Sequence, residues 1–168
     1  GYLSLMPDYV GLGVSEYFHP YVHSESEAQS CVDMLFAAYE LQSELSYNLD
    51  DQLFLFGYSQ GGHATAAMQK KIEEEYSEQF SIKASAPMSG PYDISGVQTD
   101  FLLEATTYPS PGYLPYVILS YQEVYGNIFS SLDEVFLPEY LEYIQEFWDE
   151  TISLGTLDDV LPIAPIEM

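Results

Sequence analysis

The stretch Leu53–His63, with the sequence LFLFGYSQGGH, constrains the fold of this chain more than any other segment. Four apolar residues, 53–56, lead directly into a glycine-rich turn, and a short unbroken apolar run is typical of a strand buried on both faces. The residues after the turn, His63 to Met68, are mostly small or good helix formers. The sequence therefore predicts a buried strand, a tight turn and a helix that packs closely on the strand.

The turn contains the pattern Gly57-x-Ser59-x-Gly61, which is typical of a nucleophile elbow, a sharp bend that exposes a serine between a strand and a helix. Gly57 and Gly61 lack side chains, so the strand and the helix can approach each other there. The amide of Gln60 would then lie at a helix N-terminus, where partial positive charge favours an oxyanion. The alternative is a glycine-rich turn that serves packing alone.

Segments on both sides of the elbow predict an α/β fold. Residues 1–7 are expected to form a first strand and Phe80–Pro87 a third. A helix is predicted from Ser24, as the N-cap of a capping box with Glu27, to about Ser46. The order strand, helix, strand, helix, strand favours a parallel sheet with right-handed crossovers.

Asp8 opens a glycine-rich loop, residues 8–13, that follows the first predicted strand. In open α/β sheets, ligands bind at the carboxyl ends of the strands. We therefore expect Asp8 to lie near the same sheet edge as Ser59. The alternative is an aspartate that only caps a turn.

The pattern changes in the second half of the chain. Residues 106–115 contain three prolines and a glycine and are not expected to form a regular element. Helices are predicted over 116–125 and over 138–154, the second ended by Gly155, and Ser131 begins a second capping box.

These patterns predict two domains. Residues 1–98 would form a partial α/β core that carries the elbow, and residues 99–168 a helical cap over the active site. The alternative for the second domain is an ordinary helical layer.

The chain is strongly acidic, with 27 aspartates and glutamates against three lysines and a net charge of −24. Such a surface repels nucleic acid and anionic membranes. We interpret the charge as a solubility adaptation, for example to a salty environment, in preference to an acid-specific binding role. No run reaches the roughly 18 apolar residues of a membrane span, and Cys31 is interpreted as a small buried hydrophobic residue.

A serine nucleophile needs a base, and in elbow enzymes the chain order is serine, acid, histidine. No histidine follows His63, which we interpret as a packing or hydrogen-bonding residue because it lies one helical turn after Ser59. His19 and His23 precede the serine and are the other candidates for the base. The simplest expectation is that the acid and the base lie beyond Met168, in a longer protein, since nothing in the sequence chooses among Asp149, Asp158 and Asp159.

The sequence contains no pattern for a metal or a cofactor. His19 and His23 are four residues apart, but Pro20 prevents a helical ligand pair. Neither a Walker phosphate loop nor a dinucleotide fingerprint is present.

Residues Leu55–Ala64 resemble the elbow of the α/β-hydrolase superfamily and, more narrowly, that of the secretory lipase family of yeasts and bacteria. Three further blocks of this family follow the same order in the chain: Pro7–Gly13 (PDYVGLG), His19–Tyr21 (HPY) and Ser85–Asp93 (SAPMSGPYD). The four blocks span about residues 1–93, and beyond them the likeness is limited to a helical cap inserted after a core strand.

The resemblance implies an esterase or lipase that acts on small-molecule or lipid esters through an acyl-enzyme, without a cofactor. It implies Ser59 as the nucleophile, and the Gln60 amide and Asp8 as contributors to the oxyanion hole. It also implies a secreted or cell-envelope protein with a role in lipid catabolism, whose acid and histidine follow the cap. A serine peptidase or acyltransferase on the same scaffold, and a non-catalytic binding module, are the alternatives.

Overall fold

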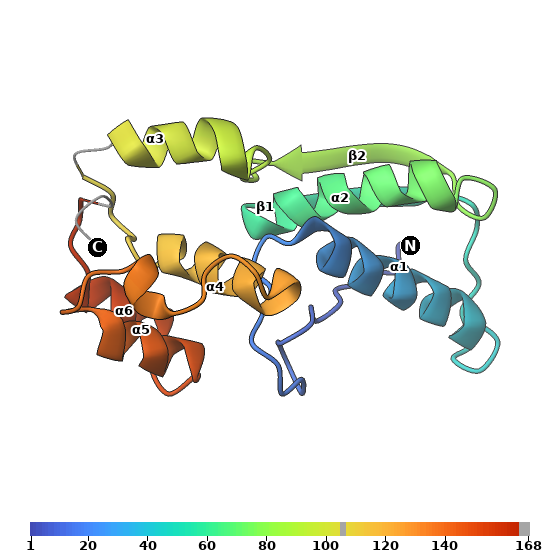
Figure 1. Cartoon of the computed structure of the whole chain (residues 1–168). Coiled ribbons are helices and arrows are strands. Elements are labelled where there is room, and N and C mark those ends of the chain that lie inside the picture. Colours follow the sequence, from blue (N-terminus) through green and yellow to red (C-terminus); the bar gives the residue numbers. More distant parts are fainter. Residues whose placement is uncertain (105–106, 165–168) are drawn as a thin grey trace. The chain divides into compact units, whose positions relative to one another are not determined.

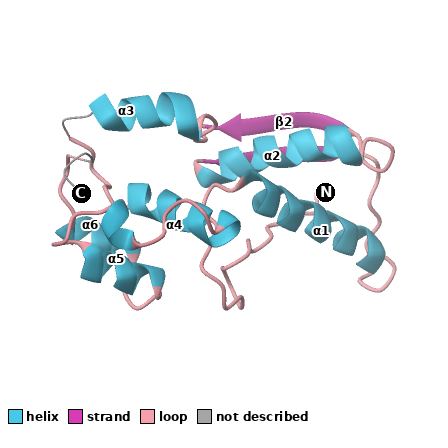
Figure 2. Ribbon diagram, in the orientation of Figure 1, coloured by secondary structure: helices cyan, strands magenta, loops and turns pink. Residues whose placement is uncertain are grey.

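The structure is a computed structural model that describes residues 1–104 and 107–164 (Figures 1 and 2). In chain order its elements are α1 (Ser24–Leu41), β1 (Leu53–Tyr58), α2 (Gln60–Glu75), β2 (Ile82–Met88), the π-helical segment η1 (Ile94–Gln98), α3 (Thr99–Glu104), α4 (Tyr113–Tyr125), the 3-10 segment η2 (Leu132–Glu134), α5 (Leu141–Trp148) and α6 (Leu154–Val160). None of the described helices is long and apolar enough to cross a membrane. The expected α/β class is confirmed.

The chain divides into two compact units, which we describe separately. The first unit contains residues 1–17 and 22–92, and the second contains residues 18–21 and the described residues from Asp93 onward. The predicted boundary at 98/99 thus differs from the contact boundary at 92/93. The role of residues 99–168 as a cap stays a prediction, and residues 105–106 and 165–168 of that range lie outside the described residues.

The first unit is built on β1 and β2, which pair in parallel from Leu53 opposite Ile82 to Tyr58 opposite Met88. Helix α2 packs on both strands, and α1 packs on α2. Apolar residues at helical spacing form the core between these layers, because they place one stripe of each helix toward the sheet. The core residues are Val32, Leu35, Leu55, Met68, Ile72 and Phe80.

Among the described residues, strand β1 buries only one face, which corrects the expectation of burial on both. Leu55 points into the core and is 7% exposed, whereas Phe56 and Tyr58 on the other face are 72% and 71% exposed. The ring of Tyr2 meets Phe54 edge-on at 5.9 Å between centroids. An apolar run shows which side chains a strand carries but not which layers pack against them. The sequence alone therefore could not predict how many faces of β1 are buried.

Residues 1–7 form no strand, which corrects a second expectation. The sheet of the described residues consists of β1 and β2, and the N-terminal segment does not pair with either. Leu5 packs instead against the core cluster as a partly buried side chain. Apolar residues in this segment can therefore contact the core without a hydrogen-bonded neighbour strand.

The N-cap of helix α1 lies one residue earlier than predicted, and the helix ends sooner. His23 is the N-cap, and its ring nitrogen accepts a hydrogen bond from the Ser26 amide at 3.3 Å, so the predicted capping box of Ser24 and Glu27 is wrong. The helix ends at Leu41 and not near Ser46. Turns follow it, in which the Glu44 amide donates to the Leu41 carbonyl at 3.1 Å and Ser46 has a φ of 58°. The Tyr47 hydroxyl donates to the Ala38 carbonyl at 2.6 Å near the last turn.

Cys31 lies on the inner side of α1, half-buried against the core cluster, as expected for a small apolar residue. Burial and the nearby Glu27 raise the pKa of its thiol to about 12. The thiol therefore stays protonated at neutral pH, and its nucleophilicity is low.

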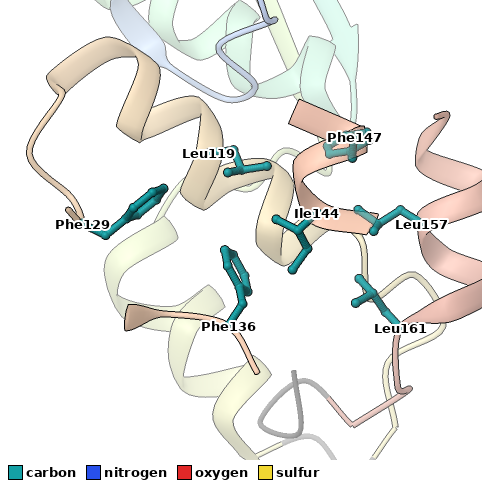
Figure 3. Packing of buried hydrophobic residues seen from close by; sticks show 7 residues of the cluster. All are labelled: Leu119, Phe129, Phe136, Ile144, Phe147, Leu157 and Leu161. Carbon is teal, nitrogen blue, oxygen red and sulfur yellow. The ribbon is translucent and has the colours of Figure 1, made fainter. Parts of the chain in front are cut away.

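The second unit is a helical bundle in which α4, α5 and α6 surround one apolar cluster (Figure 3). Its buried residues are Leu119, Phe129, Phe136, Ile144, Phe147, Leu157 and Leu161. Residues 18–21 join this unit, and the ring of Tyr21 stacks on Tyr116 at 4.7 Å between centroids. The predicted helix over 116–125 is confirmed, and it starts at Tyr113 because Pro115 is tolerated in a first turn.

The predicted helix over 138–154 is wrong: two helices, α5 and α6, occupy this region and its C-terminal continuation. The helical conformation is interrupted between them at Glu150, whose φ is 58°. Ser153 caps α6, since its hydroxyl accepts a hydrogen bond from the Thr156 amide at 3.1 Å. Gly155 therefore lies inside α6 and does not end a helix. The capping box expected at Ser131 is also absent, because the Glu134 carboxylate accepts from the Ser130 amide instead.

Close backbone approach holds the bend between β1 and α2 in place. A Cβ added to Gly57 would overlap the carbonyl oxygen of Gly61, and one added to Gly62 would overlap that of Met88. A Cβ on Gly61 would meet no described atom within 4 Å. The predicted need for glycine is thus confirmed at Gly57, whereas the second tight position is Gly62 and not Gly61.

We expect Gly62→Ala to lower the free energy of unfolding by about 2 kcal/mol, because the new methyl group meets backbone atoms that cannot move aside. Gly61→Ala, one residue earlier in the same helix, is the matched control and should be neutral or stabilising by about 0.5 kcal/mol. Urea titration followed by circular dichroism measures both. Equal stabilities of the two variants would contradict this account of the bend.

We expect added NaCl to stabilise the protein, because a net charge of −24 makes the folded chain repel itself. The Debye length falls from about 30 Å at 0.01 M salt to about 8 Å at 0.15 M. Most of the increase in Tm, roughly 3 °C or more, should therefore occur below about 0.15 M. Calorimetry that shows a rise only at molar salt would point to preferential exclusion and not to charge screening.

Candidate active site

Ser59 is the single residue between β1, which ends at Tyr58, and α2, which begins at Gln60. Its φ of 55° and ψ of −122° lie in a region that non-glycine residues rarely adopt, which costs about 1–3 kcal/mol. Three hydrogen bonds hold this backbone: the Ser59 amide donates to the Met88 carbonyl at 3.0 Å, and its carbonyl accepts from the amides of Gly62 at 2.9 Å and His63 at 3.1 Å. The strand and the helix thus meet at this one residue, which confirms the predicted bend, and Ser59 is exposed.

Gln60 is the first residue of α2, and its amide therefore lies at the positive end of the helix dipole, next to Ser59. Its side chain is half-buried and turns back toward α1, where its Nε2 donates to Glu27 Oε1 at 2.8 Å. A side-chain hydrogen bond to α1 thus holds the first residue of α2, which directly follows the serine.

His63 is buried and uses both ring nitrogens on residues of α1. Its Nδ1 lies 2.6 Å from Glu27 Oε2, and its Nε2 lies 3.3 Å from the Ser24 hydroxyl. An ionised carboxylate only accepts hydrogen bonds, so Nδ1 donates to Glu27. The interpretation of His63 as a hydrogen-bonding residue is therefore confirmed.

The other two histidines have structural surroundings of their own. His23 caps α1, and burial lowers the pKa of its ring because the charged form is disfavoured away from water. His19 belongs to the second unit, where it is buried with its ring 6.1 Å from that of Tyr116. Neither arrangement identifies a base for Ser59.

Asp8 lies in an exposed loop of the first unit, with its carboxylate against Gly13. The loop is a series of turns in which the Leu12 amide donates to the Tyr9 carbonyl at 2.9 Å. Its expected place at the end of a strand is wrong, because residues 1–7 form none. A contribution of Asp8 to an oxyanion hole stays a prediction.

Two of the downstream aspartates, Asp149 and Asp158, accept hydrogen bonds from other residues of the second unit. Asp158 Oδ1 accepts from the Gly112 amide at 2.7 Å, and Asp149 Oδ1 accepts from Gln145 Nε2 at 3.0 Å. These contacts fasten a loop and a helix end, which are structural roles.

Glu27 lies beside the elbow although its sequence pattern predicted only a capping residue. A signal was present, because Glu27, Cys31 and Leu35 follow one another at intervals of four and so share a face of the helix that packs inward. A carboxylate in such a stripe must find donors in the interior. The capping-box pattern with Ser24 hid this alternative.

No family model and no curated protein matches the chain. A solved structure from Legionella pneumophila, assigned as a hydrolase, matches 100% of this chain and 45% of its own, with a TM-score of 0.89 and 37% identity. The rice cell wall degrading esterase LipA from Xanthomonas oryzae matches 92% of this chain and 42% of its own, with a TM-score of 0.77 and 36% identity.

Candida antarctica lipase A in its closed state matches 88% of this chain and 32% of its own, with a TM-score of 0.63 and 18% identity, which shows the fold alone. The chain thus spans less than half the length of each of these proteins. The two bacterial matches combine high structural similarity with identities above one third over nearly the whole chain. The chain therefore has part of the α/β-hydrolase fold and is similar in sequence to the two bacterial proteins.

Proposed function

We propose that Ser59 is the nucleophile of a serine hydrolase that cleaves carboxylic esters. The observation that carries this proposal is the backbone of Ser59, an exposed residue at a φ of 55° between a strand and a helix. Such strain persists where the surroundings enforce it, and it clusters at active sites. The name of one matched protein, an esterase, supports an ester as the substrate.

In this mechanism the Ser59 oxygen attacks the carbonyl carbon of the ester while a general base takes the hydroxyl proton. The tetrahedral intermediate expels the alcohol, which receives that proton, and leaves an acyl-serine that water then hydrolyses. The Gln60 amide donates to the oxyanion, supported by the dipole of α2. We do not assign the base to His63, because both of its nitrogens face Glu27 and Ser24.

Asp8 is proposed as the second contributor to the oxyanion hole. The backbone amide of Asp8 can donate in either protonation state of the exposed side chain. Its backbone amide is therefore the donor that we propose. The resemblance to the secretory lipase family supports the further proposal of a secreted or cell-envelope enzyme of lipid catabolism.

We expect a fluorophosphonate probe to label the full-length protein at Ser59 and Ser59→Ala to abolish both labelling and ester hydrolysis, because the attacking oxygen is removed. Ser24→Ala is the matched control, since Ser24 is the serine whose hydroxyl lies 3.3 Å from His63 Nε2. Peptide mapping of the labelled protein locates the adduct. Labelling of Ser24, or labelling that survives Ser59→Ala, would overturn the assignment, and an unlabelled protein would favour a binding module.

We expect p-nitrophenyl esters to be hydrolysed with a kcat/KM at least about a hundredfold higher than peptide p-nitroanilides that carry matched acyl groups. The comparison separates an esterase from a serine peptidase on the same scaffold. Acyl transfer is followed in the same assay with an added alcohol. Preferred cleavage of the anilides, or transfer that exceeds hydrolysis in water, would favour the alternatives.

A further inference from the structure

We propose that Glu27 is a positioning residue for Ser59: its buried carboxylate holds the first turn of α2 and thereby the Gln60 amide in the orientation that the oxyanion requires. This inference rests on the proposed function of Ser59. It adds a residue of α1, far from the elbow in the sequence, to the machinery of the site.

Both carboxylate oxygens of Glu27 reach the same turn of the neighbouring helix. Its Oε1 accepts from Gln60 Nε2 at 2.8 Å, and its Oε2 accepts from His63 Nδ1 at 2.6 Å. Gln60 and His63 are three residues apart in α2 and therefore share a face of the helix. One carboxylate thus fastens two points of the turn that begins directly after Ser59.

The burial of Glu27 makes this contact rigid. The residue is 0% exposed, and a buried carboxylate costs several kcal/mol unless donors satisfy it. It lies in the first turn of α1 and against the first turn of α2, so the positive ends of both helix dipoles stabilise its charge. A lateral shift of α2 would separate the carboxylate from its donors, so the geometry resists such a shift.

The hydrogen bond between Gln60 and Glu27 complements a second hydrogen bond, which holds Ser59 to the sheet. On one side, the Ser59 amide donates to the Met88 carbonyl at the end of β2. On the other side, the Gln60 side chain reaches Glu27 on α1. The peptide between Ser59 and Gln60, which carries the proposed oxyanion donor, is therefore held from both sides. Displacements of about 1 Å in such a group can cost a hundredfold in rate.

The Gln60 arm can be cut without breaking the buried pair of Glu27 and His63. In the full-length protein, we expect Gln60→Ala to lower the phosphonylation rate and kcat for p-nitrophenyl butyrate by roughly tenfold, with KM changed less than about twofold. Gln69→Ala is the matched control. Gln69 lies in the same helix, and its Nε2 donates to Glu73 Oε1 at the same 2.8 Å, away from the elbow.

The control separates positioning from stability. Gln60→Ala removes a donor from a buried carboxylate and should lower the Tm more than Gln69→Ala does. Both variants are therefore assayed well below their Tm values, where we expect only Gln60→Ala to slow phosphonylation. Equal rates for Gln60→Ala, Gln69→Ala and the wild type would overturn the inference. A loss of rate in Gln60→Ala that merely follows a lower Tm, and disappears at a lower assay temperature, would also overturn it.

Substitutions of Glu27 test the other end of the tether. Glu27→Gln keeps an oxygen that can accept from Gln60, and His63 can adopt the opposite tautomer, so this variant should retain at least about a third of the wild-type rate. Glu27→Ala should lose more than tenfold. In the Gln60→Ala background, Glu27→Ala should cause a much smaller further loss, about threefold or less, and a further loss of more than tenfold, which independent effects require, would contradict the tether.

The two levels of the proposal fail differently. A wild-type protein that is not labelled at Ser59 overturns the proposed function, and this inference with it. A wild type labelled at Ser59 whose Gln60→Ala variant reacts at the wild-type rate overturns this inference alone. Should Glu27→Ala not fold, the comparison of Gln60→Ala with Gln69→Ala decides the matter.

Discussion

The close approach of three backbone segments, β1, the start of α2 and the end of β2, is the constraint on which the first unit depends. Gly57 and Gly62 allow this approach because a methyl group at either position would overlap a carbonyl oxygen. The same approach lets the Met88 carbonyl accept from the Ser59 amide, which holds Ser59 at its positive φ. The unusual backbone of the proposed nucleophile is thus a consequence of packing around it.

Buried charge joins the two helices of this unit in a chain that has few cations to spare. Lys71 is 6% exposed, and its ammonium donates to Glu25 of α1 at 2.7 Å and to Glu75 of α2 at 3.2 Å. The hydrogen bond that Lys71 donates to Glu25 is the main cause that raises the pKa of Lys71. Together with Glu27 and His63, this contact ties α1 to α2 at two levels, so the layer that supports the elbow is held by polar contacts as well as by its apolar core.

The elbow and its surroundings could be predicted from the sequence because local patterns determine them. The apolar run 53–56, the glycines and the small residues after Ser59 specify a strand, a turn and a helix within one short stretch. The segments that failed depend on distant partners. Residues 1–7 had an apolar content suited to a strand but form none, and the helix expected over 138–154 divides at Glu150, where the chain adopts a positive φ.

The sequence by itself determined the α/β class, the place of the strand-to-helix bend and the serine within it, because steric rules for glycine and apolar periodicity act over a few residues. Only the tertiary structure decided that Glu27 turns inward to meet Gln60 and His63, and that His63 faces α1. These contacts join residues more than thirty positions apart. The removal of a carboxylate from water costs free energy that these hydrogen bonds must offset. That balance depends on what packs around the carboxylate and leaves no local pattern in the chain.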